Sequence, residues 1–194
     1  MLDTRAARKE ATFDRILDAA WTLARRDGLA ALSLRELARS VGMRAPSLYT
    51  YFDSKNALYD AMYAESATLL GQAIRRAEGN AAETRLRNRF HAFIDFFAAN
   101  PARYQLVVER PVPGFQPSRA SFAIAVENFA DVVADLAEVG VTDDRAIDVW
   151  RAATTGLMTQ QIANDPGGRR WTRLADDVFD MYMTHFAKQK GRCT

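Results

Sequence analysis

The most constraining feature of the sequence is the stretch from Ser33 to Lys55, SLRELARSVGMRAPSLYTYFDSK, which is punctuated like two short helices joined by a tight turn. Gly42 lies where the first helix must end in a left-handed residue, a conformation that glycine adopts without strain. Pro46 suits the start of a second helix, because its missing N–H would be unpaired there anyway. The stretch therefore predicts a helix-turn-helix whose second helix runs from about Pro46 to Phe52.

Local signals at the helix ends agree with this outline. Ser33 and Glu36 have capping-box spacing, in which each side chain binds a free backbone N–H of the other's turn. Ala45 is expected as the N-cap of the second helix, since the following proline disfavours helical geometry at that residue. Leu48 and Phe52 are four residues apart and can pack inward together.

The residues on the outward side of the second helix help to distinguish a DNA-binding helix-turn-helix from an ordinary helical hairpin. An ordinary helical hairpin would have the same outline, so the outline alone does not establish DNA binding. Two tyrosines and two hydroxyl residues are poor choices for the solubility of so short a helix. They are good choices for hydrogen bonds to phosphates and base edges. These outward residues are Ser47, Tyr49, Thr50 and Tyr51.

Composition limits the class of protein. The chain has 194 residues, ordinary apolar and charged fractions, and no apolar run long enough to span a membrane. Its beginning lacks the apolar core of a signal peptide. Cys193 is the single cysteine, so no internal disulfide can form, and we expect a reducing cytoplasm.

The charge is small overall but unevenly distributed. The net charge is +2. Up to Leu58 there are ten lysines and arginines against seven acids, whereas the remainder has sixteen against seventeen. The basic excess therefore coincides with the helix-turn-helix, as attraction to phosphates requires.

Hydrophobic periodicity predicts helices along the whole chain. A disordered arm is expected before Thr12, and Trp21 lies off the apolar stripe of the helix that follows. Proline- and glycine-rich loops are expected at RPVPGFQPS and NDPGGRR. We predict an all-α protein of about nine helices, with a three-helix N-terminal domain and a bundle of five or six. Outside the helix-turn-helix, the expected helices are 12–26, 55–76, 80–100, a short one over 101–109, about 122–140, 143–163 and 172–188.

The segment LSLRELARSVG followed by APSLYTYFDSKNAL resembles the N-terminal domain of the TetR family of bacterial transcriptional repressors. The resemblance covers about residues 12–58 and includes the Gly28 stop, the Leu-Tyr-x-Tyr-Phe core, and Ser54 with Lys55. It implies a DNA-binding domain over residues 1–54 and a helical effector-binding and dimerisation domain over residues 55–194.

The resemblance also implies roles at the DNA. Tyr49 and Lys55 correspond to phosphate contacts, and Tyr51 lies near the backbone or a base. Arg35 is a base or phosphate candidate. Thr50 replaces a longer and often basic residue, which puts base contacts at this position in doubt. Arg44 is the stronger candidate, because arginine can bind guanine through two hydrogen bonds. Base-edge positions by this resemblance are Arg44, Ala45, Ser47 and Thr50.

Two recognition helices must lie about 34–36 Å apart to enter successive major grooves, so the second domain should form a homodimer. The resemblance implies that the last two long helices form it, although they could merely complete the core of one chain. The expected interface residues are Val149, Ala153, Leu157, Phe179, Met183 and Phe186.

The bundle is rich in aromatic residues, which are core residues by default, but the resemblance implies a pocket for an unidentified small effector. Asn128, Thr154 and Gln161 are polar groups that could orient such a ligand. The effector-lining candidates are Tyr63, Phe93, Phe97, Tyr104, Phe122, Phe129, Trp150 and Thr154.

The expected mechanism is release of a two-fold operator when an effector shifts the long helix over residues 55–76. An enzyme is the first rival class, but His91, His185 and Cys193 show no metal spacing or catalytic order, and no cofactor is expected. A helical ligand-binding or interaction protein without DNA binding is the second rival. Activation in place of repression also fits the sequence.

Overall fold

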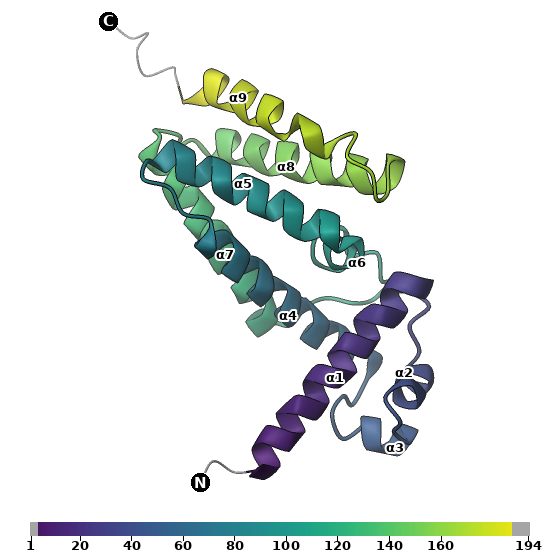
Figure 1. The fold of residues 1–194 in the computed structure, drawn as a ribbon. Helices are drawn as coiled ribbons and strands as arrows, with labels where there is room; N and C mark the ends of the chain where they lie inside the picture. Colours follow the sequence, from purple (N-terminus) through teal and green to yellow (C-terminus); the bar gives the residue numbers. More distant parts are fainter. Residues whose placement is uncertain (1–3, 188–194) are drawn as a thin grey trace, which may run out of the picture. The chain divides into compact units, whose positions relative to one another are not determined.

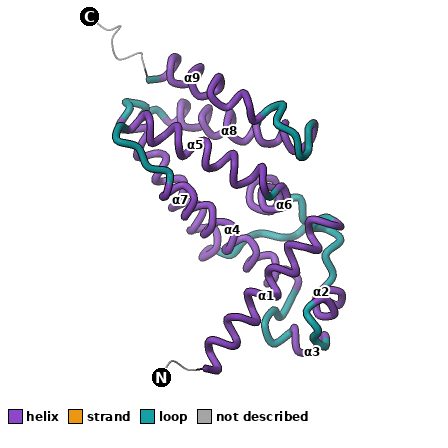
Figure 2. The backbone as a smooth tube through the Cα atoms, in the orientation of Figure 1, coloured by secondary structure: helices purple, strands orange, loops and turns teal. Residues whose placement is uncertain are grey.

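The computed structural model describes residues 4–187, and every regular element in that range is helical (Figure 1; Figure 2). The all-α prediction of about nine helices is confirmed for this part of the chain. A π-helical segment, Gln105–Glu109, and a 3₁₀ turn, Thr172–Leu174, join the α-helices. The α-helices are α1 (Thr4–Asp27), α2 (Leu34–Ser40), α3 (Ala45–Leu48), α4 (Lys55–Arg76), α5 (Ala82–Ala99), α6 (Pro101–Tyr104), α7 (Arg119–Glu138), α8 (Asp144–Asn164) and α9 (Ala175–Phe186).

The first helix is longer than the sequence pattern predicted. Helix α1 begins at Thr4, so the expectation of a disordered arm before Thr12 is wrong over residues 4–11. The hydroxyl of Thr12 donates to the carbonyl oxygen of Arg8 at 2.8 Å, within a continuous helix. Alanine, arginine, lysine and glutamate dominate this stretch and are strong helix formers. Cys193 lies outside the described residues.

The chain divides into two compact units. The first unit comprises the chain up to residue 66 together with residues 102–122. The second comprises residues 67–101 together with the chain from residue 123 onward. Helices α4 and α7 each contribute to both units. A functional boundary between residues 54 and 55 stays a prediction, because a division by packing does not report where function divides.

The first unit is built on α1, with α2 and α3 beside it (Figure 1). The apolar stripe of α1 faces inward, and Ile16 and Ala20 are fully buried. The ring of Phe13 lies against that of Phe52, with centroids 5.1 Å apart, which holds the end of the helix-turn-helix to α1. Leu37 of α2 and Leu48 of α3 complete this core. The predicted three-helix arrangement is therefore present.

Trp21, which the apolar stripe of α1 leaves unexplained, is buried in a polar cluster of the first unit. Its Nε1 donates to Glu65 of α4 at 2.6 Å, and the guanidinium of Arg103 lies 4.4 Å from the centre of a Trp21 ring. Arg103 also donates to Glu65 at 2.7 Å and to Ser66 at 3.0 Å. The cluster thus ties α1 and α4 to α6, and each buried polar atom in it has a partner.

The second unit has an aromatic core formed by α5, α8 and α9. Trp150 lies at its centre, with ring centroids 5.3 Å from Phe90, 5.9 Å from Phe179 and 5.0 Å from Tyr182. The Tyr182 hydroxyl donates to the carbonyl oxygen of Ala146 at 2.9 Å, which satisfies the one polar atom of that ring. Tilted and edge-on rings of this kind stabilise a core beyond their buried area.

Arginines of α5 link this core to the flanking helices. Asp135 of α7 is buried and accepts hydrogen bonds from Arg85 at 2.7 Å and Arg89 at 2.6 Å. On the other side, Arg87 binds Asp176 of α9 at 2.7 Å, and its guanidinium covers the ring of Phe179. Charged side chains of α5 therefore fix its relation to both α7 and α9.

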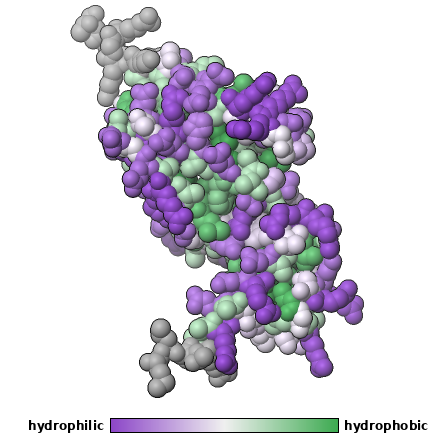
Figure 3. All heavy atoms as spheres, viewed as in Figure 1, coloured by the Kyte–Doolittle hydropathy of each residue, from purple (hydrophilic) through white to green (hydrophobic). Residues whose placement is uncertain are grey.

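Polar side chains cover much of the face visible in Figure 3, with apolar ones showing between them. No helix among residues 4–187 is both long enough and apolar enough to cross a membrane. A few large apolar side chains are exposed nonetheless. They are Tyr49, Leu69, Phe122, Val126, Val149 and Met181.

Candidate nucleic-acid interface

The turn between α2 and α3 has the geometry that its glycine predicts. Gly42 has φ +71° and donates its N–H to Arg39 at 3.1 Å, and Met43 donates to Ala38 at 2.8 Å. These two bonds close the end of α2 in the way typical of a left-handed helix terminus. The backbone then extends at Arg44, which has φ −78° and ψ +145°.

Helix α3 differs from the prediction at both ends. Arg44 is the N-cap and Ala45 the first helical residue, so the assignment of Ala45 as N-cap is wrong by one position. The helix ends at Leu48 rather than Phe52. Turn hydrogen bonds nevertheless continue, because Tyr51 and Phe52 both donate to the carbonyl oxygen of Leu48, at 2.9 and 3.1 Å.

The predicted capping box at α2 does not form. Ser33 is the N-cap, but its side chain makes no capping hydrogen bond. Glu36 instead accepts a hydrogen bond from Arg26 at 2.6 Å, and Arg26 also binds its neighbour Asp27. The guanidinium holds the pKa of Asp27 below its usual value. A charged partner on α1 thus outcompetes a backbone N–H for the Glu36 carboxylate.

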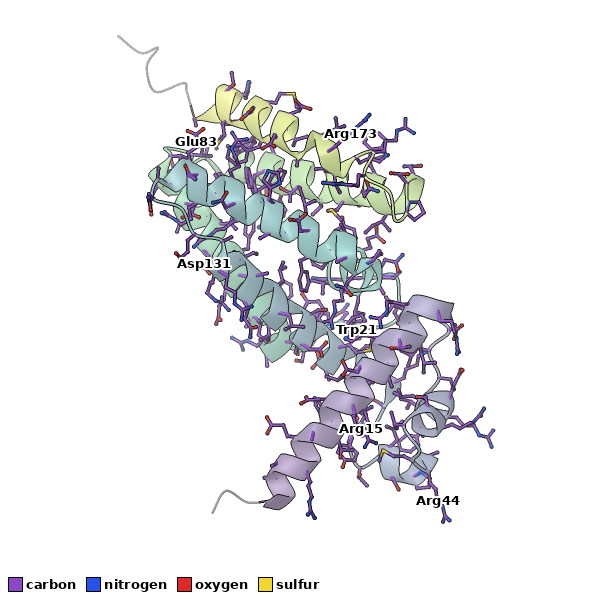
Figure 4. All side chains as sticks on the ribbon, viewed as in Figure 1. Arg15, Trp21, Arg44, Glu83, Asp131 and Arg173 are labelled. Carbon is purple, nitrogen blue, oxygen red and sulfur yellow. The ribbon has the colours of Figure 1, made fainter. Side chains whose placement is uncertain are left out.

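The two arginines proposed to reach DNA are free within the described residues. Neither Arg35 nor Arg44 makes an ion pair or a side-chain hydrogen bond within residues 4–187, and both are exposed. In Figure 4 the side chain of Arg44 extends away from the helices into open space. A charge without an internal partner can bind an anion without first breaking a bond in the protein.

The remaining predicted contacts are less uniform. Tyr49 is 53% exposed, which is high for a ring of its size. Ser47 and Thr50 are also exposed, whereas Ala45 and Tyr51 are half-buried. The Thr50 hydroxyl donates to the carbonyl oxygen of Ser47 at 2.7 Å. That bond uses the only hydroxyl proton of Thr50, which leaves the side chain with an acceptor and a methyl group for other contacts.

Lys55 differs from the two arginines because one of its three N–H donors is bonded inside the protein. Its Nζ donates to the carbonyl oxygen of Ala30 at 2.9 Å and lies 5.5 Å from the centre of the Tyr59 ring. The residue is half-buried. The neighbouring Ser54 caps α4, since its hydroxyl accepts from the Ala57 N–H at 3.0 Å, as predicted.

The predicted effector residues fall in both units. Phe93 and Phe97 contact each other at 4.9 Å between ring centroids, and Trp150 lies in the aromatic core. Phe129 is covered by the guanidinium of Arg151. Tyr63, Tyr104 and Phe122 belong to the first unit; Tyr63 and Tyr104 are buried, and Phe122 is 43% exposed.

The three polar groups proposed to orient a ligand have bonds inside the protein. Thr154 donates to the carbonyl oxygen of Trp150 at 2.7 Å, and Asn128 donates to that of Ala67 at 2.6 Å. Gln161 organises the loop after α8, because its Oε1 accepts from the backbone N–H groups of Trp171 and Thr172. Each of these groups therefore contributes to the fold of the second unit.

The predicted dimer residues divide by exposure. Leu157, Phe179 and Met183 are buried within the chain itself, so they belong to its core. Val149 is 38% exposed, and Ala153 and Phe186 are half-buried. Met181 of α9 is 70% exposed and was not among the predicted interface residues. A methionine so exposed on a helix is an apolar surface without a partner in the single chain.

Taken together, α2, the Gly42 turn and α3 define a helix-turn-helix protein with a helical bundle. Residues 16–62 match the family model described as bacterial regulatory proteins, tetR family. The match covers the helix-turn-helix and the helices that flank it, so this part of the chain is similar to the DNA-binding domain of TetR family regulators.

Solved structures share the fold over nearly the whole chain. The regulatory protein SCO4313 is 22% identical with a TM-score of 0.80, covering 94% of this chain and 100% of its own. The TetR family transcriptional regulator PfmR from Thermus thermophilus is 21% identical with a TM-score of 0.66, covering 88% and 97%. A TetR variant from Acinetobacter baumannii AYE in complex with minocycline is 20% identical with a TM-score of 0.60, covering 91% and 94%.

Proposed function

We propose that this protein is a cytoplasmic homodimeric repressor that binds a two-fold symmetric operator and leaves it when a small effector binds the bundle. The observation that carries the proposal is the exposed surface of the helix-turn-helix. There Arg44 and Arg35 have no partner within residues 4–187, and Tyr49 exposes half of its ring. A surface of this kind supplies the charge and the hydrogen-bond donors that phosphates and bases require.

Within this proposal Arg44 reads sequence. An arginine that binds guanine through two hydrogen bonds contributes about 1–3 kcal/mol of discrimination against other bases. Tyr49 and Tyr51 bind the backbone, and Ser47 and Thr50 lie at base edges together with Ala45. Arg35, on the first turn of α2, binds a phosphate or a base.

The homodimer is proposed to form through α8 and α9. Its support is the exposure of Val149 on α8 and Met181 on α9, with Phe186 half-buried at the end of α9. Dimerisation would remove these apolar side chains from water. Light scattering of the parent and of Met181→Lys tests this step. The parent should be a dimer, and the charged variant should already be monomeric at protein concentrations at which the parent is still a dimer.

DNA binding is tested by selecting duplexes from random or genomic DNA and measuring affinity by fluorescence anisotropy. The parent should bind a two-fold symmetric sequence, and its affinity should fall steeply as salt rises. Arg44→Ala should weaken binding and relax the preference at one base pair of each half-site. Arg25→Ala, which removes an exposed charge on α1, serves as the matched control and should change affinity much less.

Effector release is tested by measuring operator affinity with and without candidate ligands. Minocycline is bound by the Acinetobacter baumannii relative, and it provides a first compound to try. A coupling of about 1–3 kcal/mol would be sufficient for regulation. If the parent binds no duplex in a salt-dependent manner but does bind ligands, the protein is a ligand-binding member without DNA-binding function, and the proposal fails.

A further inference from the structure

The first turns of α1 carry charges of opposite sign on different sides of the helix. An α-helix turns by about 100° per residue, so Glu10 and Asp14, four residues apart, lie on one side. The midpoint between Arg8 and Lys9 falls nearly opposite the midpoint between these two acids. All four residues are exposed, so this separation of charge is a property of the surface of the first unit.

The side of α1 that carries Arg8 faces the helix-turn-helix. Arg15 follows Arg8 by two turns and therefore lies on the same side of the helix. The Arg15 Nη2 donates to the carbonyl oxygen of Val41, which follows α2, at 3.2 Å. Arg26 continues this row and binds Glu36 of α2 at 2.6 Å. The two later arginines of the row thus contact α2 or its end, and Arg8 extends the row by about 10 Å toward the start of α1.

Lys9 extends the apolar stripe of α1 past the core in the same way. Phe13 follows Lys9 by one turn, and its ring packs against that of Phe52, which comes after α3. Ile16 and Ala20, which lie next on this stripe, are fully buried, whereas Lys9 is exposed. Where α1 continues beyond the core, a cation therefore occupies the side that faces the end of the helix-turn-helix.

These two cations are free to bind an anion. Neither Arg8 nor Lys9 makes an ion pair or a side-chain hydrogen bond within residues 4–187. The first turns of α1 lie at the same end of the first unit as α3, where Arg44 extends into open space (Figure 1; Figure 4). The basic side of α1 is thus continuous with the surface proposed to bind DNA.

We propose that Arg8 and Lys9 enlarge the DNA interface by binding phosphates beside the base pairs that α3 reads, while Glu10 and Asp14 face away from the duplex. The inference rests on the proposed DNA-binding function and adds two residues to its interface. Cations without an internal partner supply the charge that duplex phosphates attract, and such contacts position a protein without reading sequence. The acids on the other side disfavour any docking that turns them toward the duplex.

Salt dependence tests the contact, with the selected operator, full-length protein and potassium chloride from about 50 to 200 mM. Each phosphate contact contributes roughly 0.9 to the slope of log affinity against log salt, so Arg8→Met should reduce the slope by about 1.8 in a dimer. Adding Lys9→Met should reduce it by about 1.8 again. Arg25→Met is the matched control, because it removes an exposed charge from the acidic side of the same helix, and its slope should equal that of the parent. Parallel lines for Arg8→Met and the parent would overturn the proposal.

A transposed variant separates the position of the charge from its amount. Ala7 precedes Asp14 by two turns and therefore lies on the acidic side of α1. The double variant Ala7→Arg/Arg8→Ala keeps the composition and the net charge, and both residues are strong helix formers. Its slope should fall by about 1.8, as in Arg8→Met. A slope equal to that of the parent would overturn the proposal, because only the total charge would then matter.

An unrelated duplex shows whether Arg8 binds phosphates or bases. Arg8→Met should weaken binding to the operator and to the unrelated duplex by the same factor, with an unchanged urea midpoint, whereas Arg44→Ala should lose affinity mainly for the operator. A loss confined to the operator in Arg8→Met would overturn the assignment to phosphates. Failure of the proposed function would appear differently, as a parent that binds neither duplex at about 50 mM salt, and it would overturn both proposals.

Discussion

Both units contain ion pairs between helices, such as Arg103–Glu65 in the first and Arg85–Asp135 in the second, but they differ in how their shorter segments are held. In the first unit several side chains donate to backbone carbonyls, as Tyr59 does to Leu29, Lys55 to Ala30 and Arg15 to Val41. In the second unit arginines pair with carboxylates between helices, as Arg85 and Arg89 do with Asp135.

The difference follows from helix length. Helices α2 and α3 have seven and four residues, so most of their carbonyls lie at an end without an intrahelical partner. Side chains of the longer helices α1 and α4 instead bind carbonyls of the segments that flank α2, since Leu29 and Ala30 precede this helix and Val41 follows it. Helices α5 and α8 have eighteen and twenty-one residues, and their backbone groups are largely satisfied internally. We infer that loss of single hydrogen bonds mainly changes the placement of helices in the first unit. In the second unit, loss of buried side chains mainly lowers the free energy of unfolding.

Trp150→Ala should have the largest effect on stability. The ring is nearly fully buried and contacts Phe90, Phe179 and Tyr182, so truncation leaves a cavity at the centre of the second unit. Removal of a buried tryptophan costs about 3–5 kcal/mol of unfolding free energy. Urea unfolding at constant protein concentration measures this loss. Asp148→Ala, at an exposed position of the same helix, is the control and should change stability by less than about 0.5 kcal/mol.

Asp135→Ala should be the next most damaging change. It leaves the guanidinium groups of Arg85 and Arg89 partly buried without their carboxylate, and breaking a buried pair from one side costs about 3 kcal/mol. Urea unfolding again provides the measurement. Asp131→Ala is the matched control, since its carboxylate is 39% exposed and pairs with Arg75 at a longer 3.6 Å. Equal losses in the two variants would show that burial of Asp135 is not the cause.

Alkaline pH should weaken both units to a similar extent. Burial raises the pKa of Tyr59 to about 12, and burial together with Asp143 raises that of Tyr182 to about 12. Between pH 10 and 12 the unfolded chain loses these phenolic protons while the folded chain keeps them. The two tyrosines therefore leave the free energy of unfolding unchanged below pH 10. Above pH 10 this free energy falls, by about 2 kcal/mol for each tyrosine.

Unfolding in urea at pH 9 and pH 11.5 checks this prediction. Tyr59→Phe and Tyr182→Phe should each lose less stability over that interval than the parent, because phenylalanine has no proton to release. A parent whose stability is the same at both pH values would contradict the prediction for both units.

Local signals predicted much of the fold. Gly42 ends α2 and Ser54 caps α4, since each depends only on the conformation of its own turn. Partners distant in the sequence were not predictable. Glu36 bonds to Arg26 in place of its own helix end, and Trp21 bonds to Glu65, which lies forty-four residues away.

The candidate sites show the same limit. Periodicity shows that Phe179 and Met183 are on an apolar face of α9, but it does not say which neighbour covers that face. In the structure both are buried in their own chain, while Met181 is exposed. The family resemblance assigned Lys55 to a phosphate, and nothing near Lys55 in the sequence indicates its bond to Ala30.

Asp176→Asn should have the smallest effect and sharpens the contrast between buried and exposed pairs within the second unit. The hydrogen bond from His91, followed by that from Arg87, holds the pKa of Asp176 below its ordinary value. The carboxylate is 62% exposed, so solvent screening limits its contribution to about 0.5 kcal/mol or less. That contribution is present above the unfolded pKa and is lost as the pH falls through the lower folded value. The difference in unfolding free energy between parent and variant should therefore shrink below about pH 4. If Asp176→Asn lowered the unfolding free energy as much as Asp135→Ala does, α9 would depend on this pair far more than its exposure indicates.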